Sequence, residues 1–72
     1  AVRRMADELE VGLVAAQREG VLDTAADPHR LANTFLACFE GGLLVAVSTG
    51  EVQALEDSLA AALLVLEGHG IT

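Results

Sequence analysis

The sequence lacks the residues that usually reinforce a small fold. It has a single cysteine, which excludes an internal disulfide, and its two histidines, His29 and His69, have no second ligand at zinc-binding spacing. A chain of 72 residues buries only about 60% of its unfolded surface. Such a core rarely supplies more than about 3–5 kcal/mol of stability. We therefore expect no metal ion and no cofactor, and self-association remains as the means of stabilisation.

Lysine, tryptophan and tyrosine are also absent, and cationic residues are few. Four arginines face eleven acidic residues, so the net charge of −7 repels phosphate backbones and anionic lipid. The longest uninterrupted apolar run, Leu59 to Leu66, has 8 residues, whereas a bilayer span needs about twenty. The amino terminus shows no basic segment followed by an apolar one. These features predict a cytoplasmic chain that contacts neither nucleic acid nor a membrane directly.

The residues that are abundant favour helix. The chain is 53% hydrophobic, and Leu and Ala, which favour helices over strands, dominate. Apolar residues recur at three- and four-residue steps and predict three helices, at about 1–19, 28–48 and 51–67. The sequence thus predicts an all-α fold in one domain, 1–72.

Helix boundaries carry local signals. We expect Gly20 to end the first helix, and Asp27 to cap the second with Pro28 at its first position. Val21 and Leu22 should tuck into the core between these helices. The chain end after the third helix, 68–72, should fray because of its glycines.

The second helix has more apolar surface than one neighbour can cover. Its apolar residues span roughly 200° of the circumference, whereas a helix on a single core needs a stripe a little over 100° wide. Cys38, Gly42 and Ala46 share one side, a row of small residues that would let another backbone come close. Each glycine inside a helix destabilises it by on the order of 1 kcal/mol relative to alanine, so Gly41 and Gly42 need a packing reason to be there.

The third helix repeats that pattern. The break at Ser48, Thr49 and Gly50 leaves room only for a tight turn, which predicts an antiparallel helical hairpin. Besides its main leucine stripe, the third helix has a second strip of smaller residues. That strip comprises Ala54, Ser58, Ala61 and Val65. Both helices are therefore expected to pack on two sides, against their own chain and against something else.

Few side chains suggest chemistry. Cys38 is interpreted as a small buried hydrophobe and the histidines as solvated. Glu40 lies at the edge of the apolar arc, where a carboxylate either lines a cavity or interface or, as we favour, is exposed at a rim. No nucleophile, base and orienting group occur together, so no catalytic residue and no enzyme is predicted.

Three segments in order resemble a known family. They are Ala16–Leu22 (AQREGVL), Asp27–Ala32 (DPHRLA) and Phe39–Leu44 (FEGGLL), followed by a short turn into a Leu- and Ala-rich helix. This arrangement resembles the carboxy-terminal effector-binding and dimerisation domain of TetR-family transcriptional regulators. The resemblance implies that 1–72 is a fragment, that the amino-terminal helix-turn-helix is absent, and that DNA is contacted only through that missing domain.

The resemblance also implies a homodimer in which the last two helices form a four-helix bundle with a second subunit. The function expected is homodimerisation and part of effector sensing in a TetR-like repressor; the alternative is a structural helical protein–protein interaction module with no ligand. Which of the two apolar faces is the dimer side stays open. The candidate interface comprises Cys38, Gly41, Gly42, Val45, Ala46, Ala54, Ser58, Ala61 and Val65. Met5, Leu9, Phe35 and Phe39 are candidates for one wall of a pocket for a small hydrophobic effector, or else ordinary core.

Overall fold

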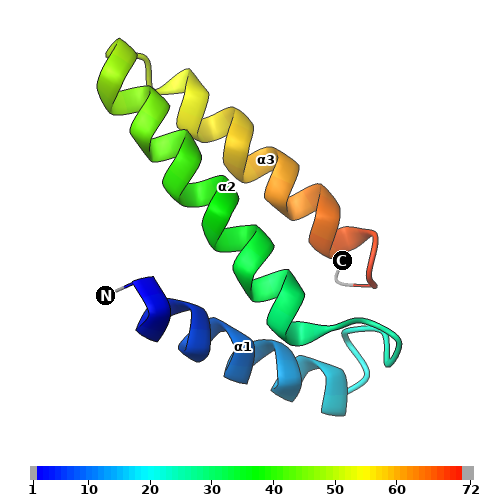
Figure 1. The fold of residues 1–72 in the computed structure, drawn as a ribbon. Helices are drawn as coiled ribbons and strands as arrows, with labels where there is room; N and C mark the ends of the chain where they lie inside the picture. The colour runs from blue at the N-terminus through cyan, green and yellow to red at the C-terminus, as the bar shows by residue number, and fades with distance from the viewer. Residues whose placement is uncertain (1, 71–72) are drawn as a thin grey trace.

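The computed structural model describes residues 2–70. Over that range the chain forms three α-helices and no strand: α1 (Val2–Arg18), α2 (Pro28–Thr49) and α3 (Gln53–Glu67). Figure 1 shows α2 and α3 side by side as an antiparallel hairpin, with α1 crossing the amino-terminal end of α2. The predicted all-α class is confirmed. Ala1, predicted within the first helix, and 71–72, predicted to fray, lie outside the described residues.

The end of α1 follows its glycine signal. Gly20 has a φ of 80°, in the left-handed region that residues with a Cβ rarely adopt. Just beyond it, the N–H groups of Val21 and Leu22 both donate to the carbonyl of Ala16, at 2.9 and 3.2 Å. The glycine therefore turns the chain back on the last turn of α1, as predicted.

The start and end of α2 also follow local signals. The Asp27 carboxylate accepts from the N–H groups of His29 and Arg30 at 3.1 and 3.2 Å, and Pro28 occupies the first turn. At the other end Gly50 has a φ of 74° and donates its N–H to the Ala46 carbonyl at 2.8 Å. These two caps explain why α2 has nearly its predicted length.

The hydrophobic core lies at one end of the molecule. It forms where α1, the connection after it, the start of α2 and Leu66 of α3 meet. Leu22 is only 2% exposed, as predicted, whereas Val21 is 49% exposed, so the prediction for Val21 was wrong. The turn around Gly20 directs only one of these two neighbours inward. The central residues are Leu13, Leu22, Ala26, Leu31 and Ala32.

The described part of the chain end contacts the rest of the protein. The N–H of Asp23 donates to the carbonyl of His69 at 2.9 Å. Gly70, with a φ of 98°, lies so close that an added Cβ would be 3.3 Å from the Asp23 nitrogen. The predicted fraying was therefore wrong for residues 68–70, because a backbone hydrogen bond holds them against the α1–α2 connection.

The side chain of Gln17 forms hydrogen bonds to the backbone of that connection, which the sequence did not suggest. Its side-chain nitrogen lies 3.0 Å from the carbonyl oxygen of Asp23 and 2.9 Å from that of Ala26.

We expect Gln17→Met, which keeps the length but removes the donor, to lower the free energy of unfolding by about 1 kcal/mol. Urea unfolding measures this. Gln53, whose amide bonds only to Asp57 one turn along α3 at 2.8 Å, is the control. An equal loss in Gln53→Met would contradict the role given to Gln17.

The three helices leave much of the chain uncovered. The radius of gyration is 12.9 Å, against about 11 Å for a compact domain of this length. The accessible surface is 4762 Å², against about 4200 Å² for a compact monomer of this mass. Over the described residues α1 packs on α2 and α2 on α3, while α1 and α3 do not pack as helices. The hairpin therefore has two sides, and only part of one is covered.

Candidate interaction surfaces of the hairpin

The seam between α2 and α3 is closest at Gly42. A Cβ added there would lie 2.5 Å from the Cβ of Ser58 and 3.3 Å from the carbonyl oxygen of Ala54. Real Cβ atoms do not approach so closely, so only glycine fits. The predicted close crossing therefore exists, but it is made with α3 of the same chain.

This finding corrects the expected partner of Gly42. The residue is buried in the single chain, so a second subunit cannot contact it without displacing α3. Ser58 faces it and donates its hydroxyl to the Ala54 carbonyl at 2.9 Å. Ala46, one turn along α2, is half-buried beside the same seam. Three of the nine candidate interface residues thus lie at the internal contact.

The seam divides the hairpin into two flanks. With Gly42 and Ser58 turned toward each other, a rotation of about 100° per residue assigns the remaining positions to one side or the other. One side is the α1 flank, identified by Leu36, which lies with Ala6 of α1 in a shared groove. The opposite side, the open flank, has no helix of the described chain packed on it. The other six candidate residues lie there: Cys38, Gly41, Val45, Ala54, Ala61 and Val65.

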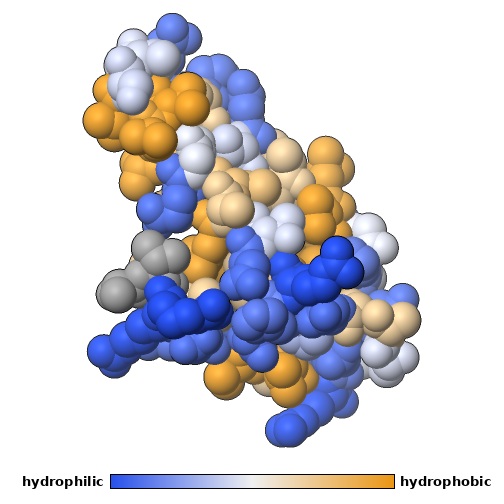
Figure 2. All heavy atoms as spheres, viewed as in Figure 1, coloured by the Kyte–Doolittle hydropathy of each residue, from blue (hydrophilic) through white to orange (hydrophobic). Residues whose placement is uncertain are grey.

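The open flank consists of small side chains, with the carboxylate of Asp57 beside Ala54 and Ala61 on α3. All six of its residues are exposed or half-buried, and Val45 is 49% exposed. A Cβ added at Gly41 would meet no atom within 4 Å. Figure 2 shows pale spheres, the colours of small residues, over the middle of α2 and α3, with strongly hydrophobic residues at the tip of the hairpin. Two such surfaces could approach each other closely where the Asp57 carboxylates, each bonded to Gln53, stay at the edge of the contact.

Polar contacts join α1 to the α1 flank. His29 Nδ1 lies 2.8 Å from the Glu10 carboxylate, and His29 Nε2 lies 3.3 Å from the Asn33 amide nitrogen. The Arg3 guanidinium reaches the Asn33 amide oxygen at 3.5 Å and pairs with Asp7 at 3.1 Å. His29, predicted to be simply solvated, is thus part of a chain of contacts from α1 to α2. The sequence could not show this, since Glu10 and His29 are 19 residues apart.

A shallow groove separates α1 from α2. Arg3, Asn33 and Glu40 stand around an apolar floor, so Glu40 does line a groove while remaining partly exposed. Both interpretations of Glu40, a carboxylate that lines a cavity and a carboxylate exposed at a rim, are therefore partly correct. The floor comprises Ala6, Leu36 and Ala37.

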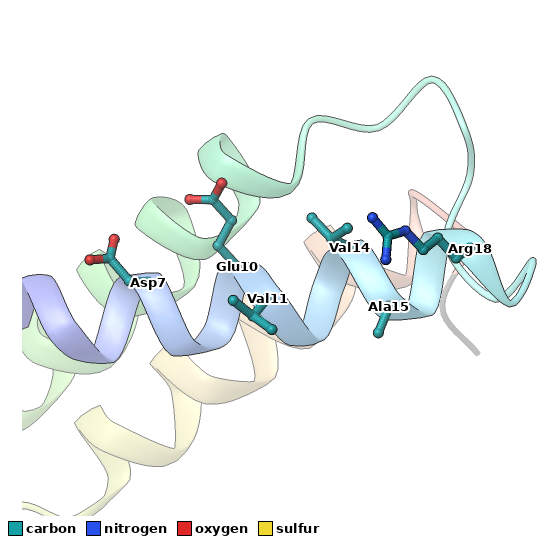
Figure 3. Close-up of a pocket in the computed structure, with 6 residues that line it drawn as sticks. All are labelled: Asp7, Glu10, Val11, Val14, Ala15 and Arg18. Atoms are coloured by element: carbon teal, nitrogen blue, oxygen red, sulfur yellow. The ribbon is translucent and has the colours of Figure 1, made fainter.

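A second groove belongs to α1 alone. Figure 3 shows its lining side chains, which all project from one helix: Asp7, Glu10, Val11, Val14, Ala15 and Arg18. Val11 is 70% exposed. This groove is one face of a helix rather than an enclosed cavity.

The candidate effector wall is dispersed. Leu9 packs against the hydrophobic core, Phe35 and Phe39 are half-buried on α2, and Met5 is exposed on α1. None of the four lines either groove described above. A ligand wall formed by these residues stays a prediction.

The possible metal ligands of the described chain do not cluster. Within residues 2–70, no three His, Cys, Asp or Glu side chains come together as a metal site would require. Cys38 is a free thiol and is half-buried rather than buried.

Known proteins provide no further guide. No protein-family model, curated protein or solved structure matches this chain. By length and composition α2 could cross a membrane, although the core helix of a soluble protein has the same properties. The cytoplasmic localisation therefore stays a prediction.

Proposed function

We propose that the chain is the homodimerisation region and part of the effector-sensing domain of a TetR-like transcriptional repressor. The observation that carries this proposal is the open flank, a row of small residues on two antiparallel helices. Two such hairpins, packed flank to flank, would form a four-helix bundle. The ordered resemblance of Ala16–Leu22, Asp27–Ala32 and Phe39–Leu44 to that family supports the same proposal.

Sensing would act through α1. This helix packs on α2 and is tied to it by the contacts of Glu10 with His29 and of Arg3 with Asn33. An effector entering beside α1 and α2 would change how α1 lies on the hairpin. The bundle would then alter the separation of two DNA-reading domains of the parent protein. A helix-turn-helix in residues preceding Ala1 is the expected source of those domains.

Self-association is the first result expected. The chain should sediment as a dimer at micromolar concentration, because burying both open flanks supplies apolar area that the monomer lacks. Each copy has a net charge of −7, so raising the NaCl concentration from 0.05 to 0.5 M should strengthen the dimer severalfold by screening. Sedimentation equilibrium measures both effects. A chain that is well folded but still monomeric at about 100 μM, near the top of the micromolar range, would count against the proposal.

The alternative, a structural module without a ligand, is favoured by one observation. None of the four candidate effector-wall residues lines either of the two grooves described above. A module whose partner is a different protein would leave the purified chain monomeric or aggregated. The same sedimentation experiment therefore separates the two functions.

A further inference from the structure

The α1 flank is apolar well beyond the area that α1 covers. Beyond the area that α1 covers, it presents Leu43 and Val47 near the end of α2, Val52 at the turn and Leu63 farther along α3. All four are exposed, Val47 by 74% and Leu63 by 55%. The core cluster includes none of them, although Leu66, three residues after Leu63, packs against it. We call these four residues the exposed strip.

Acidic residues border the exposed strip. Glu40 lies on the same face of α2 as Leu43 and Val47, and Glu56 lies one turn from Val52 on α3. Among the described residues neither carboxylate has a cation within ion-pair distance. Arg3 of α1 lines the same groove as Glu40, but its ion pair is with Asp7. No Lys or Arg follows Arg30 in the sequence, so the hairpin itself borders the strip with carboxylates.

We propose that the exposed strip binds an amphipathic helix of another protein that carries Lys or Arg along the edges of its apolar face. Leucine-sized side chains would cover Val47 and Leu63, while the cations would meet Glu40 and Glu56. Helices that lay an apolar face into a groove are a common mode of recognition. This surface lies on the opposite flank from the proposed dimer contact and serves a different partner.

A second copy of the chain fits the exposed strip less well. A symmetric contact there would bring each Glu40 and Glu56 toward the same carboxylates of the other copy, and like charges at an interface oppose binding. The open flank has one carboxylate between Ala54 and Ala61, that of Asp57, and it accepts a hydrogen bond from the Gln53 amide at 2.8 Å. Glu40 and Glu56 have no ion-pair partner among the described residues. The two flanks therefore suit different occupants, a twin hairpin on one and a cationic helix on the other.

The test uses a fluorescent peptide of about 18 residues, long enough for five helical turns, made of Leu and Lys with Leu on one helical face. Controls are a scrambled peptide of the same composition and a patterned peptide with Glu in place of Lys. Fluorescence anisotropy at physiological salt should show the patterned Lys peptide binding at least about tenfold more tightly than either control.

Matched variants locate the contact. Val47→Asn with Leu63→Asn should weaken binding of the patterned Lys peptide about tenfold or more, since both methyl-rich side chains leave the interface. Glu40→Gln with Glu56→Gln should weaken it severalfold and reduce its dependence on salt. Val45→Asn, on the open flank, should leave it unchanged. Circular dichroism checks that each variant keeps its helices, as the exposure of Val47 and Leu63 leads us to expect.

Three outcomes would overturn this inference. Equal binding of the scrambled peptide would mean that the net charge of the chain alone attracts cations. Loss of binding in Val45→Asn, with none in Val47→Asn plus Leu63→Asn, would place the peptide on the open flank. Dissociation of a dimer by Val47→Asn plus Leu63→Asn would make a second copy the occupant. Homodimerisation is measured separately by sedimentation without peptide, so the two proposals can fail independently.

Discussion

Gly42→Leu is expected to remove much of the stability of the folded state. The first atom of the new side chain would already lie 2.5 Å from the Cβ of Ser58, and the rest would have to enter the seam between α2 and α3. Overpacking of this kind costs typically about 1–3 kcal/mol or more, while the whole core supplies only about 3–5 kcal/mol. Thermal unfolding followed by circular dichroism should show a much lower melting temperature than that of the unchanged chain.

A pair of alanine variants isolates the cause. Alanine favours a helix by about 1 kcal/mol over glycine, so Gly41→Ala, which meets no atom within 4 Å, should raise the melting temperature. Gly42→Ala gains the same preference but meets Ser58, and a net loss of about 1 kcal/mol is expected. Adding Ser58→Gly to Gly42→Ala should recover part of that loss. Equal melting temperatures for Gly41→Ala and Gly42→Ala would mean that the helices do not cross at Gly42.

Val45→Arg is expected to dissociate the proposed dimer. In a symmetric contact between open flanks the substitution places two guanidinium groups in an apolar interface, where unpaired charges cost several kcal/mol. Since each 1.4 kcal/mol is a factor of ten, the dissociation constant should rise by about 100-fold or more. Val45 is already 49% exposed in the single chain, so the monomer should keep its helices.

Val47→Arg is the matched control. It makes the same substitution two positions along α2 but on the α1 flank, and it also changes the net charge from −7 to −6. Sedimentation equilibrium should show an unchanged dimer. The reverse pattern, with Val47→Arg monomeric and Val45→Arg dimeric, would move the dimer contact to the α1 flank. Two dimeric variants would exclude either hairpin flank as the contact.

The proposed repressor role depends on which surfaces are free. Gly42 packs against α3 of its own chain, so it is not free to contact a partner. The part of the candidate interface that a partner can reach is the exposed row that includes Gly41, Val45 and Ala61. The groove between α1 and α2 lies on the other flank. A ligand there would reach the dimer contact only by changing how α1 and α2 pack.

Local sequence signals predicted the helices well because their causes lie within a few residues. Gly20 and Gly50 adopt positive φ angles that follow from the absence of a side chain, and Asp27 caps the nearest free N–H groups. Val21 shows the limit of this reasoning. Its hydrophobicity suggested burial, but the turn leaves Leu22 as the residue that points into the core.

Contacts between distant residues could not be predicted in the same way. Glu10 meets His29, and the side chain of Gln17 bonds to Asp23 and Ala26, only because α1 folds back across the start of α2. Periodicity places Glu10 and Gln17 on polar faces of the first helix. It does not say which other polar face lies opposite.

By itself the sequence determined that this chain is helical, where α1 ends and where α2 begins and ends, and that α2 and α3 have more apolar surface than one contact can bury. It placed the start of α3 two residues too early, at 51 instead of Gln53. Only the tertiary structure decided how those surfaces are shared: Gly42 faces Ser58 within the chain, and the row that includes Val45 and Ala61 faces outward. The physical reason is that helical periodicity fixes which residues share a face. The rotation of one helix against another depends on how closely the side chains of both can pack.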